Sequence, residues 1–338
     1  MTIQSVSEIF VGRASEGLKE LLPDSRVIVI TDATIEHLYH DLVGRFESII
    51  IGHGEANKSL DTALFIYNRL MAMGADRSTF LLGVGGGIIT DITGFVASTF
   101  MRGVRFGFVS TTLLGQVDAS VGGKNGVNLD GYKNMIGCFN QPEFVLCDIE
   151  MLHSLSDRQF RAGLAELIKT GMLGNRVLFE MVEAMSFEEL RRDPLLMADL
   201  ILMAVKIKAG IVERDERESG ERRKLNLGHT VAHAIEKSSR KMLHGEAVAV
   251  GCVVMARLSV NMGFMPEREA ARIEAVFARL GFTLTSPAPI EKMIVALRKD
   301  KKAAADQIRI VLPVAIGRCE VRSVAFDWLE ERLREVMK

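Results

Sequence analysis

Three histidines lie close together in the sequence, within the motifs LNLGHTVAHAIE and LHGEAVAVG: His229, His233 and His244. His229 and His233 are four residues apart, so on a helix they would share one face and could bind one zinc ion. The motif is not HExxH, because threonine follows His229. A single histidine is more often a core or surface residue, but three beside glycines favour a metal site.

The missing ligand of such a site is expected to be a carboxylate. Glu166 is the candidate, because it lies in the middle of the helical pattern RAGLAELIKTG among apolar residues. An ionised side chain is costly to bury there without a partner. We therefore expect Glu166 to have one.

A glycine cluster follows an apolar run in LLGVGGGIITDITGFVAS. Gly86 and Gly87 stand just before an expected helix whose first turns carry Asp91. Glycine lets backbone NH groups approach a pyrophosphate, and a helix N-terminus adds unpaired donors and a favourable dipole. The cluster is equally typical of an ordinary turn between a strand and a helix.

Three further polar residues could contact a nucleotide. Asp32 ends the first apolar run, in VITDAT, where a carboxylate could accept hydrogen bonds from a ribose. A solvated loop aspartate is as common at such a position. The motif GEANKS at 54–59 adds Glu55 and Lys58 as contacts of low specificity.

The stretch TTLLGQVDASVGGKNGVNLDGYKNMIG predicts a binding loop, because its polar residues lie among glycines and small residues that would not form a stable helix face. They are Asp118, Lys124, Lys133 and Asn134. Basic residues recur in apolar surroundings elsewhere: Arg102, Lys169, Lys208, Arg222 and Lys301. Each could be a simple surface charge, and the RKDKK run around Lys301 is typical of a solvated face. Together they would form a local pocket suited to carboxylate and phosphate.

The elements that must position these residues fall into two groups. Up to about Asp148, apolar runs alternate with amphipathic stretches, which predicts strands at 26–30, 48–51, 79–84, 106–110 and 144–148. From about Leu152 the periodicity predicts helices at 158–173, 197–213, 229–237 and 246–262, with one short strand at 308–313. A chain of 338 residues can hold two such domains, and clefts between unlike domains are favoured ligand sites.

Composition excludes several classes of function. The 42 basic and 43 acidic residues give a net charge of −1, so nothing general attracts nucleic acid or an anionic membrane. No signal-like segment and no run approaching the ~20 apolar residues of a membrane span are present, so we expect a cytoplasmic protein. Four dispersed cysteines without a CxxC pair are expected to be buried thiols.

With these residues in view, the chain closely resembles the 3-dehydroquinate synthase family over nearly its whole length. The strongest signatures are GGGIITDITGFVASTFMRGVRF, TTLLGQVDASVGGKNGVN, KNMIG, GLAELIKTG, LNLGHTVAHAIE and LHGEAVAVG. The resemblance implies an α/β N-terminal Rossmann-like domain at 1–150 that binds NAD+. An all-α C-terminal metal-binding domain would follow at 151–338. It also implies a homodimer.

The resemblance further implies a role for each candidate residue. Zinc or cobalt would be bound by Glu166, His229 and His244, so that His233 would instead contact substrate or relay a proton. NAD+ would meet Asp32, Glu55, Lys58, Gly86, Gly87, Asp91, Thr111, Thr112, Asp118, Lys124 and Lys133. The substrate would meet Asp118, Lys124, Asn134, Lys169, Lys208, Arg222, Asn226 and His233, with a lysine of the RKDKK run, represented by Lys301. Arg102 would reach the substrate phosphate from the neighbouring subunit.

The implied reaction converts 3-deoxy-D-arabino-heptulosonate 7-phosphate into 3-dehydroquinate and phosphate. A ring alcohol is oxidised, phosphate leaves by elimination, the hydride is returned, and an intramolecular aldol addition closes the carbocycle. The metal would act as a Lewis acid on vicinal hydroxyls. The cofactor would end unchanged.

Three alternatives remain. A related sugar-phosphate cyclase, forming a deoxy-inosose or a valiolone, would have less use for Lys208, Arg222, Asn226 and His233, which together favour an acid substrate. A metal-dependent alcohol or glycerol-phosphate dehydrogenase would release NADH, and the KNMIG and GGKN motifs argue against it. A silent NAD-binding or scaffold protein would have lost a metal ligand or Lys124, and all are present.

Overall fold

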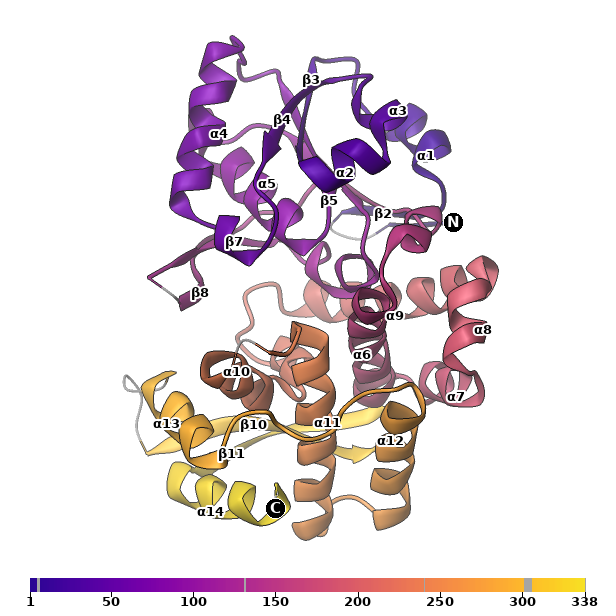
Figure 1. Ribbon diagram of the computed structural model, residues 1–338, viewed down its shortest axis with the longest axis vertical. Helices are drawn as coiled ribbons and strands as arrows, with labels where there is room; N and C mark the ends of the chain where they lie inside the picture. Colours follow the sequence, from indigo (N-terminus) through magenta and orange to yellow (C-terminus); the bar gives the residue numbers. More distant parts are fainter. Residues whose placement is uncertain (5–6, 131, 240, 301–305, 338) are drawn as a thin grey trace. The chain divides into compact units, whose positions relative to one another are not determined.

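The computed structural model describes residues 1–4, 7–130, 132–239, 241–300 and 306–337. The chain divides into two compact units, Met1–Ser156 and Asp157–Lys338, each described by itself below (Figure 1). Lys301, the representative of the RKDKK run, lies outside the described residues.

The N-terminal unit is built on a seven-stranded sheet in the order β1-β2-β9-β6-β5-β3-β4. All five predicted strands are present and pair in parallel: β3 (Val27–Asp32), β4 (Glu47–Ile51), β5 (Phe80–Gly85), β6 (Phe106–Ser110) and β9 (Phe144–Cys147). All but the edge strand β4 are buried almost throughout, because both faces of a parallel sheet are covered. Two short strands at the other edge, β1 (Thr2–Gln4) and β2 (Glu8–Val11), were not predicted.

Helices connect these strands. The α-helices are α1 (Ala14–Leu21), α2 (Ala33–Leu38), α3 (His40–Val43), α4 (Leu60–Ala72) and α5 (Gly87–Thr99). Shorter 3-10 segments are η1 (Glu55–Asn57), η2 (Phe100–Arg102) and η4 (Glu150–Ser154), and η3 (Gly115–Ala119) is a π-helix. The strand-helix alternation confirms the predicted α/β organisation.

The predicted binding loop after β6 is largely a β-hairpin, which corrects that prediction. Its strands, β7 (Lys124–Leu129) and β8 (Tyr132–Phe139), pair antiparallel. β8 is exposed at most positions, so it shows no apolar alternation in the sequence. Gly126 faces Gly137, and a Cβ at Gly126 would lie 2.7 Å from the carbonyl oxygen of Ile136, so the glycines permit close pairing of the strands.

The C-terminal unit is mainly helical, as predicted. Its helices are α6 (Asp157–Gly174), α7 (Arg176–Ala184), α8 (Phe187–Arg192), α9 (Pro194–Arg214), η5 (Glu221–Asn226), α10 (His229–Ser238), α11 (His244–Asn261), α12 (Glu267–Arg279), α13 (Ile290–Asp300) and α14 (Phe326–Val336). The expected strand at 308–313 lies within β10 (Gln307–Ala315), which pairs antiparallel with β11 (Arg318–Ala325). This hairpin is the part that an all-α description leaves out.

The structure also tests two smaller expectations, on the cysteines and on membrane spans. Cys147, Cys252 and Cys319 are buried free thiols, whereas Cys138 on β8 is only half-buried, so the prediction of four buried thiols holds for three. Within the described residues, no helix is long and apolar enough to cross a membrane.

Candidate metal and nucleotide sites

Three helices of the C-terminal unit bring Glu166, His229 and His244 together. Every residue of α6 from 162 to 173 is buried, so Glu166 is enclosed on all sides. α11 begins at His244 and crosses α6 closely, because a Cβ at Gly245 would overlap the carbonyl oxygen of Ala162. The chain reaches α10 through Gly228, whose φ of 77° lies in the left-handed region, and His229 is the first helical residue.

The donor atoms of this group are spaced as ligands of one metal ion would be. Oε1 of Glu166 lies 3.6 Å from Nε2 of His229 and 3.4 Å from Nε2 of His244. All three donor atoms lie within 4.8 Å of one another. Tetrahedral zinc with bonds of about 2.1 Å places its ligand atoms about 3.4 Å apart. Oε1 of Glu166, the oxygen that faces both histidines, is buried without a hydrogen-bond partner among the described residues, so a cation would satisfy it.

Each imidazole is oriented through its other ring nitrogen. Nδ1 of His229 lies 3.1 Å from the carbonyl oxygen of Leu227, and Nδ1 of His244 lies 3.4 Å from Oε1 of Glu236. Carbonyl and carboxylate partners of this kind fix the tautomer that leaves Nε2 unprotonated for a metal. The residues present therefore fit a divalent metal.

A buried lysine lies beside the metal group. Nζ of Lys169 is 2.5 Å from Oε2 of Glu166 and donates a hydrogen bond of 2.9 Å to the carbonyl oxygen of Leu225. Burial alone would raise the pKa of Glu166, but the Lys169 ammonium and the two imidazoles outweigh it and hold that pKa well below its usual range. Burial, together with the same ammonium, lowers the pKa of His229 to about 3, so its imidazole is neutral.

His244 behaves differently from His229. Burial lowers its pKa, but contacts with the carboxylates of Glu166 and Glu236 more than compensate, raising it to about 10. In the metal-free protein this imidazole carries the proton that a bound cation would displace.

His233 lies beside the group without joining it. Its ring centroid is 5.4 Å from that of His229 and 6.3 Å from that of His244, and the residue is exposed. The structure thus groups His229 with His244 and Glu166 rather than with its i+4 neighbour. An exposed imidazole remains accessible to a ligand.

The predicted anion-binding residues of this unit lie on α9 and η5. Lys208 and Arg222 are buried, at 7% and 2% exposure. The guanidinium of Arg222 donates from Nη1 to the carbonyl oxygen of Glu216, and Asn226 donates from Nδ2 to Oε1 of Glu218. Lys208 and Arg222, which were predicted to bind an anion, are thus both buried in the same unit.

Two residues of the loop before η5 were missed by the sequence analysis. Glu218 holds a φ of 59°, unusual for a residue with a side chain, while it accepts from Asn226. Asp215 accepts from the backbone of Ser219, Gly220 and Arg222 at 2.8, 2.7 and 2.9 Å. The only signal in the sequence was an acidic loop between two expected anion-binding residues.

In the N-terminal unit, the glycine cluster lies where β5 meets α5. Gly86 is the N-cap of α5, and Gly87 is its first residue. A Cβ at Gly86 would lie 2.9 Å from Cγ2 of Thr112, so a side chain at this position would crowd Thr112. Oγ1 of Thr111 is buried without a hydrogen-bond partner among the described residues. This arrangement suits the phosphates of a nucleotide.

Asp32 has a structural role that the sequence did not reveal. Its Oδ1 caps α2 by accepting from Thr34 N at 2.8 Å and Ile35 N at 3.0 Å. Oδ2 lies 3.6 Å from Nδ1 of His53. The cap orients the carboxylate at the C-terminal end of β3, the position at which a ribose contact was predicted.

Four predicted ligand contacts are linked through Lys58. Nζ of this buried lysine donates to Oδ2 of Asp91 and, at 2.5 Å, to Oδ1 of Asn134. Asn134 has a φ of 53° and donates its backbone NH to Oδ1 of Asn128, which in turn donates from Nδ2 to Oε1 of Glu55. Residues from α5, η1 and the β7–β8 hairpin therefore form one polar network.

The remaining candidates of this unit lie on irregular or exposed segments. Asp118 is half-buried within the π-helix η3, an element often found at functional sites. Lys124 and Lys133 are exposed on the two strands of the β7–β8 hairpin. Arg102 is exposed at the end of η2, and both it and Met101 have left-handed φ values, 69° and 50°.

Comparison with known proteins agrees with this arrangement. Family models described as 3-dehydroquinate synthase N-terminal and C-terminal match residues 48–162 and 163–303. A 3-dehydroquinate synthase of Dictyoglomus thermophilum is 40% identical over 297 residues, covering 87% of this chain and 84% of that protein.

Two solved structures are similar in fold over nearly the whole chain. A 2-deoxy-scyllo-inosose synthase in complex with carbaglucose-6-phosphate, NAD+ and Co2+ has a TM-score of 0.89 at 26% identity, covering 99% of this chain and 100% of that one. A 2-epi-5-epi-valiolone synthase from Streptomyces hygroscopicus with NAD+ and Zn2+ has a TM-score of 0.88 at 26% identity, covering 99% and 97%. The matches across both units and the identity to the curated relative show that the chain belongs to the 3-dehydroquinate synthase family.

Proposed function

We propose that this chain is an enzyme that converts 3-deoxy-D-arabino-heptulosonate 7-phosphate into 3-dehydroquinate and phosphate. The observation that carries the proposal is the group of Glu166, His229 and His244, with a fully buried carboxylate and donor atoms at metal-ligand spacing, in a member of this family. The activity would belong to the shikimate pathway and aromatic amino-acid biosynthesis.

The proposed cofactors are NAD+ and one divalent metal, zinc or cobalt. Support comes from the donor set above and from the two structural relatives, whose complexes hold NAD+ with Co2+ or Zn2+. When bound, NAD+ supplies a reversible hydride acceptor, and the metal supplies Lewis acidity toward neighbouring hydroxyl groups.

The residues of the C-terminal unit would then hold and polarise the substrate. Lys208 and Arg222, both buried, would bind the substrate carboxylate through charge-assisted hydrogen bonds, and Asn226 would contact a neighbouring polar group. His233 is exposed and has an imidazole suited to relay a proton. Lys169 would hold the Glu166 carboxylate ionised and would also contact the substrate. A lysine of the RKDKK run, with Lys301 as the candidate, would be a further substrate contact.

The residues of the N-terminal unit would hold the nucleotide. Gly86 and Gly87 would present backbone NH groups to the pyrophosphate at the start of α5, and Asp32 would accept from a ribose. The other proposed nucleotide contacts are Glu55, Lys58, Asp91, Thr111, Thr112, Asp118, Lys124 and Lys133. Asp118, Lys124 and Asn134 would also meet the substrate. For Asn134, support comes from its hydrogen bond with Lys58, a proposed nucleotide contact.

We also propose a homodimer in which Arg102 reaches the substrate phosphate of the neighbouring chain. Two consecutive left-handed residues, Met101 and Arg102, hold an exposed guanidinium on a strained turn, and such strain is usually retained for a function. The proposed domain limits are 1–150 and 151–338, and the proposed location is the cytoplasm.

The alternative is a related cyclase acting on a neutral sugar phosphate. Its support is the likeness to the 2-deoxy-scyllo-inosose synthase structure, and the buried Lys208 and Arg222 count against it. Phosphate release should be measured separately with 3-deoxy-D-arabino-heptulosonate 7-phosphate, glucose 6-phosphate and sedoheptulose 7-phosphate. Release from the first alone supports the proposal, whereas release from either of the others without the first would replace it.

A further inference from the structure

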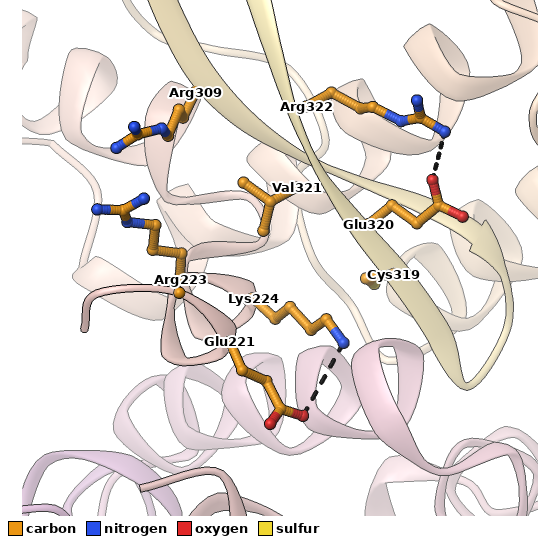
Figure 2. A pocket seen from close by; sticks show the side chains of 9 residues that line it. Glu221, Arg223, Lys224, Arg309, Cys319, Glu320, Val321 and Arg322 are labelled. Atoms are coloured by element: carbon orange, nitrogen blue, oxygen red, sulfur yellow. Dashed lines mark hydrogen bonds and ion pairs between the residues drawn. The ribbon is translucent and has the colours of Figure 1, made fainter. Parts of the chain in front are cut away.

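The C-terminal unit carries a groove whose residues have no role in the proposed reaction. It lies between η5 and the β10–β11 hairpin, is open to solvent, and has a volume of about 710 Å³ (Figure 2). Its walls are Gly220, Glu221, Arg223 and Lys224 at η5, Arg309 on β10 and residues 319–322 on β11. All of these residues belong to the described part of one unit.

The carboxylates of this groove are already matched by cations. Glu320 pairs with Arg322, and Figure 2 shows both side chains extending away from Arg223 and Arg309. Glu221 accepts from the guanidinium of Arg214 at 2.9 and 3.1 Å, and Nζ of Lys224 is a further 3.9 Å neighbour. No carboxylate of the groove is therefore left over for its remaining cations.

Those remaining cations are Arg223 and Arg309. Their guanidinium groups extend toward the same side of the groove (Figure 2). Among the described residues, neither side chain has a hydrogen bond or an ion pair. Two like charges at one groove repel each other unless an anion lies between them.

The floor of the groove is apolar and uncharged. Val321 projects from β11 beside the two arginines, and Cys319, two residues earlier on the same strand, lines the groove near Lys224 (Figure 2). Burial raises the pKa of the Cys319 thiol to about 12, so it stays neutral. Cations above an apolar floor suit a molecule with an anionic end and an organic body.

We propose that this groove binds the phosphate group of a small phosphorylated molecule, held by Arg223 and Arg309 with Lys224 nearby. A guanidinium presents paired donors to a phosphate. The two guanidinium groups, from η5 and β10, would donate hydrogen bonds to different oxygens of the same phosphate. The volume leaves room for an organic moiety beside the phosphate. Arg222, the neighbour of Arg223, is not part of this site, because it is buried and donates to the carbonyl oxygen of Glu216.

Calorimetric titration with inorganic phosphate at constant ionic strength tests the proposal on the full chain. The double variant R223Q/R309Q should bind one phosphate fewer per chain, or bind it on the order of tenfold more weakly. The matched control is R318Q, which removes an exposed arginine from the same hairpin outside the groove. The control should reproduce the wild-type titration.

Phosphate at the proposed active site would bind in all of these proteins, so only their difference reports on the groove. R309K keeps the charge but loses the paired donors, and it should weaken binding partially. R309Q alone replaces the double variant if the latter does not fold. Identical titrations for wild type, R318Q and the groove variants would overturn the proposal, whether or not the enzyme is active.

Discussion

Lys169 and Glu166 form a buried ion pair one helical turn apart on α6, with Nζ 2.5 Å from Oε2 and side-chain exposures of 2% and 0%. Removing one partner of such a pair leaves an uncompensated charge, whereas the pair together adds little. The pair therefore keeps Glu166 ionised before any metal arrives, and it makes the metal site sensitive to substitution of either residue.

The first prediction concerns the metal. E166Q should lose the bound divalent ion and lower the free energy of unfolding by about 3–5 kcal/mol, because buried Lys169 loses its counter-charge. Metal content by mass spectrometry and denaturant unfolding measure the two effects. E274Q is the control, since Glu274 forms an exposed pair with Arg257 that contributes about 0–1 kcal/mol. Full metal content in E166Q would contradict the ligand assignment.

The second prediction concerns the packing that brings His229 to His244. A Cβ at Gly251 of α11 would overlap the carbonyl oxygen of Gly228, just before His229. G251A should therefore separate α10 from α11, lowering the free energy of unfolding by about 1–3 kcal/mol and weakening metal binding. G210A is the matched control in α9, where only the end of Arg214 lies near, and it should be stabilising by about 0.5–1 kcal/mol. Equal metal affinity in the two variants would refute this account.

The third prediction concerns pH and the loop before η5. Hydrogen bonds from the backbone of Arg222, Gly220 and Ser219 lower the pKa of Asp215 from its ordinary value of 3.8, despite an opposing effect of desolvation. Ionised Asp215 therefore stabilises the loop fully at any pH above the ordinary pKa of the carboxyl group. This contribution is lost only when the pH falls through the lowered pKa. Exchange protection of the Gly220 and Arg222 amides, corrected for intrinsic rates, should be constant from neutral pH down to that ordinary value.

D215N is the test of that assignment. It should reduce the same protection at neutral pH and raise KM more than it lowers kcat, because Arg222 follows the loop directly. Protection that is unchanged in D215N would show that Asp215 does not organise the loop.

The fourth prediction concerns Arg102. If it acts across the dimer, R102A and H233A chains are each inactive alone, but a heterodimer of the two has one site with both residues intact. Differently tagged chains, refolded together and purified by both tags, should regain activity. Arg102 and His233 are both exposed, so neither substitution threatens the fold. A heterodimer as inactive as its parents would place Arg102 within its own chain's site.

Apolar pattern predicted the fold well where burial dominates. The parallel strands β3, β5, β6 and β9 are buried on both faces, and α6 and α11 are buried along nearly their whole length, so their apolar residues alone locate them. The β7–β8 hairpin escaped detection because β8 is mostly exposed and its pairing depends on Gly126 and Gly137. Register and close backbone approach leave no periodic signal.

In the candidate site, too, the sequence predicted what depends on burial and missed what depends on the packing and geometry of the backbone. Glu166 was found from its apolar surroundings, since a buried acid needs a partner. Spacing alone favoured His233 as the partner of His229, and only the crossing of α11 over α6 explains why His244 lies there. The roles of Asp215 and Glu218 depend on loop geometry, which residue types do not encode.

The most direct test of the central claim is the number of product molecules formed for each NAD+ supplied. With 3-deoxy-D-arabino-heptulosonate 7-phosphate in large excess over NAD+, the purified protein should release many phosphates per NAD+. It should form 3-dehydroquinate in an amount equal to the phosphate released, without accumulating NADH. A chelator should stop the reaction, and zinc or cobalt should restore it. NADH formed in proportion to substrate consumed, or turnover indifferent to the chelator, would contradict the account.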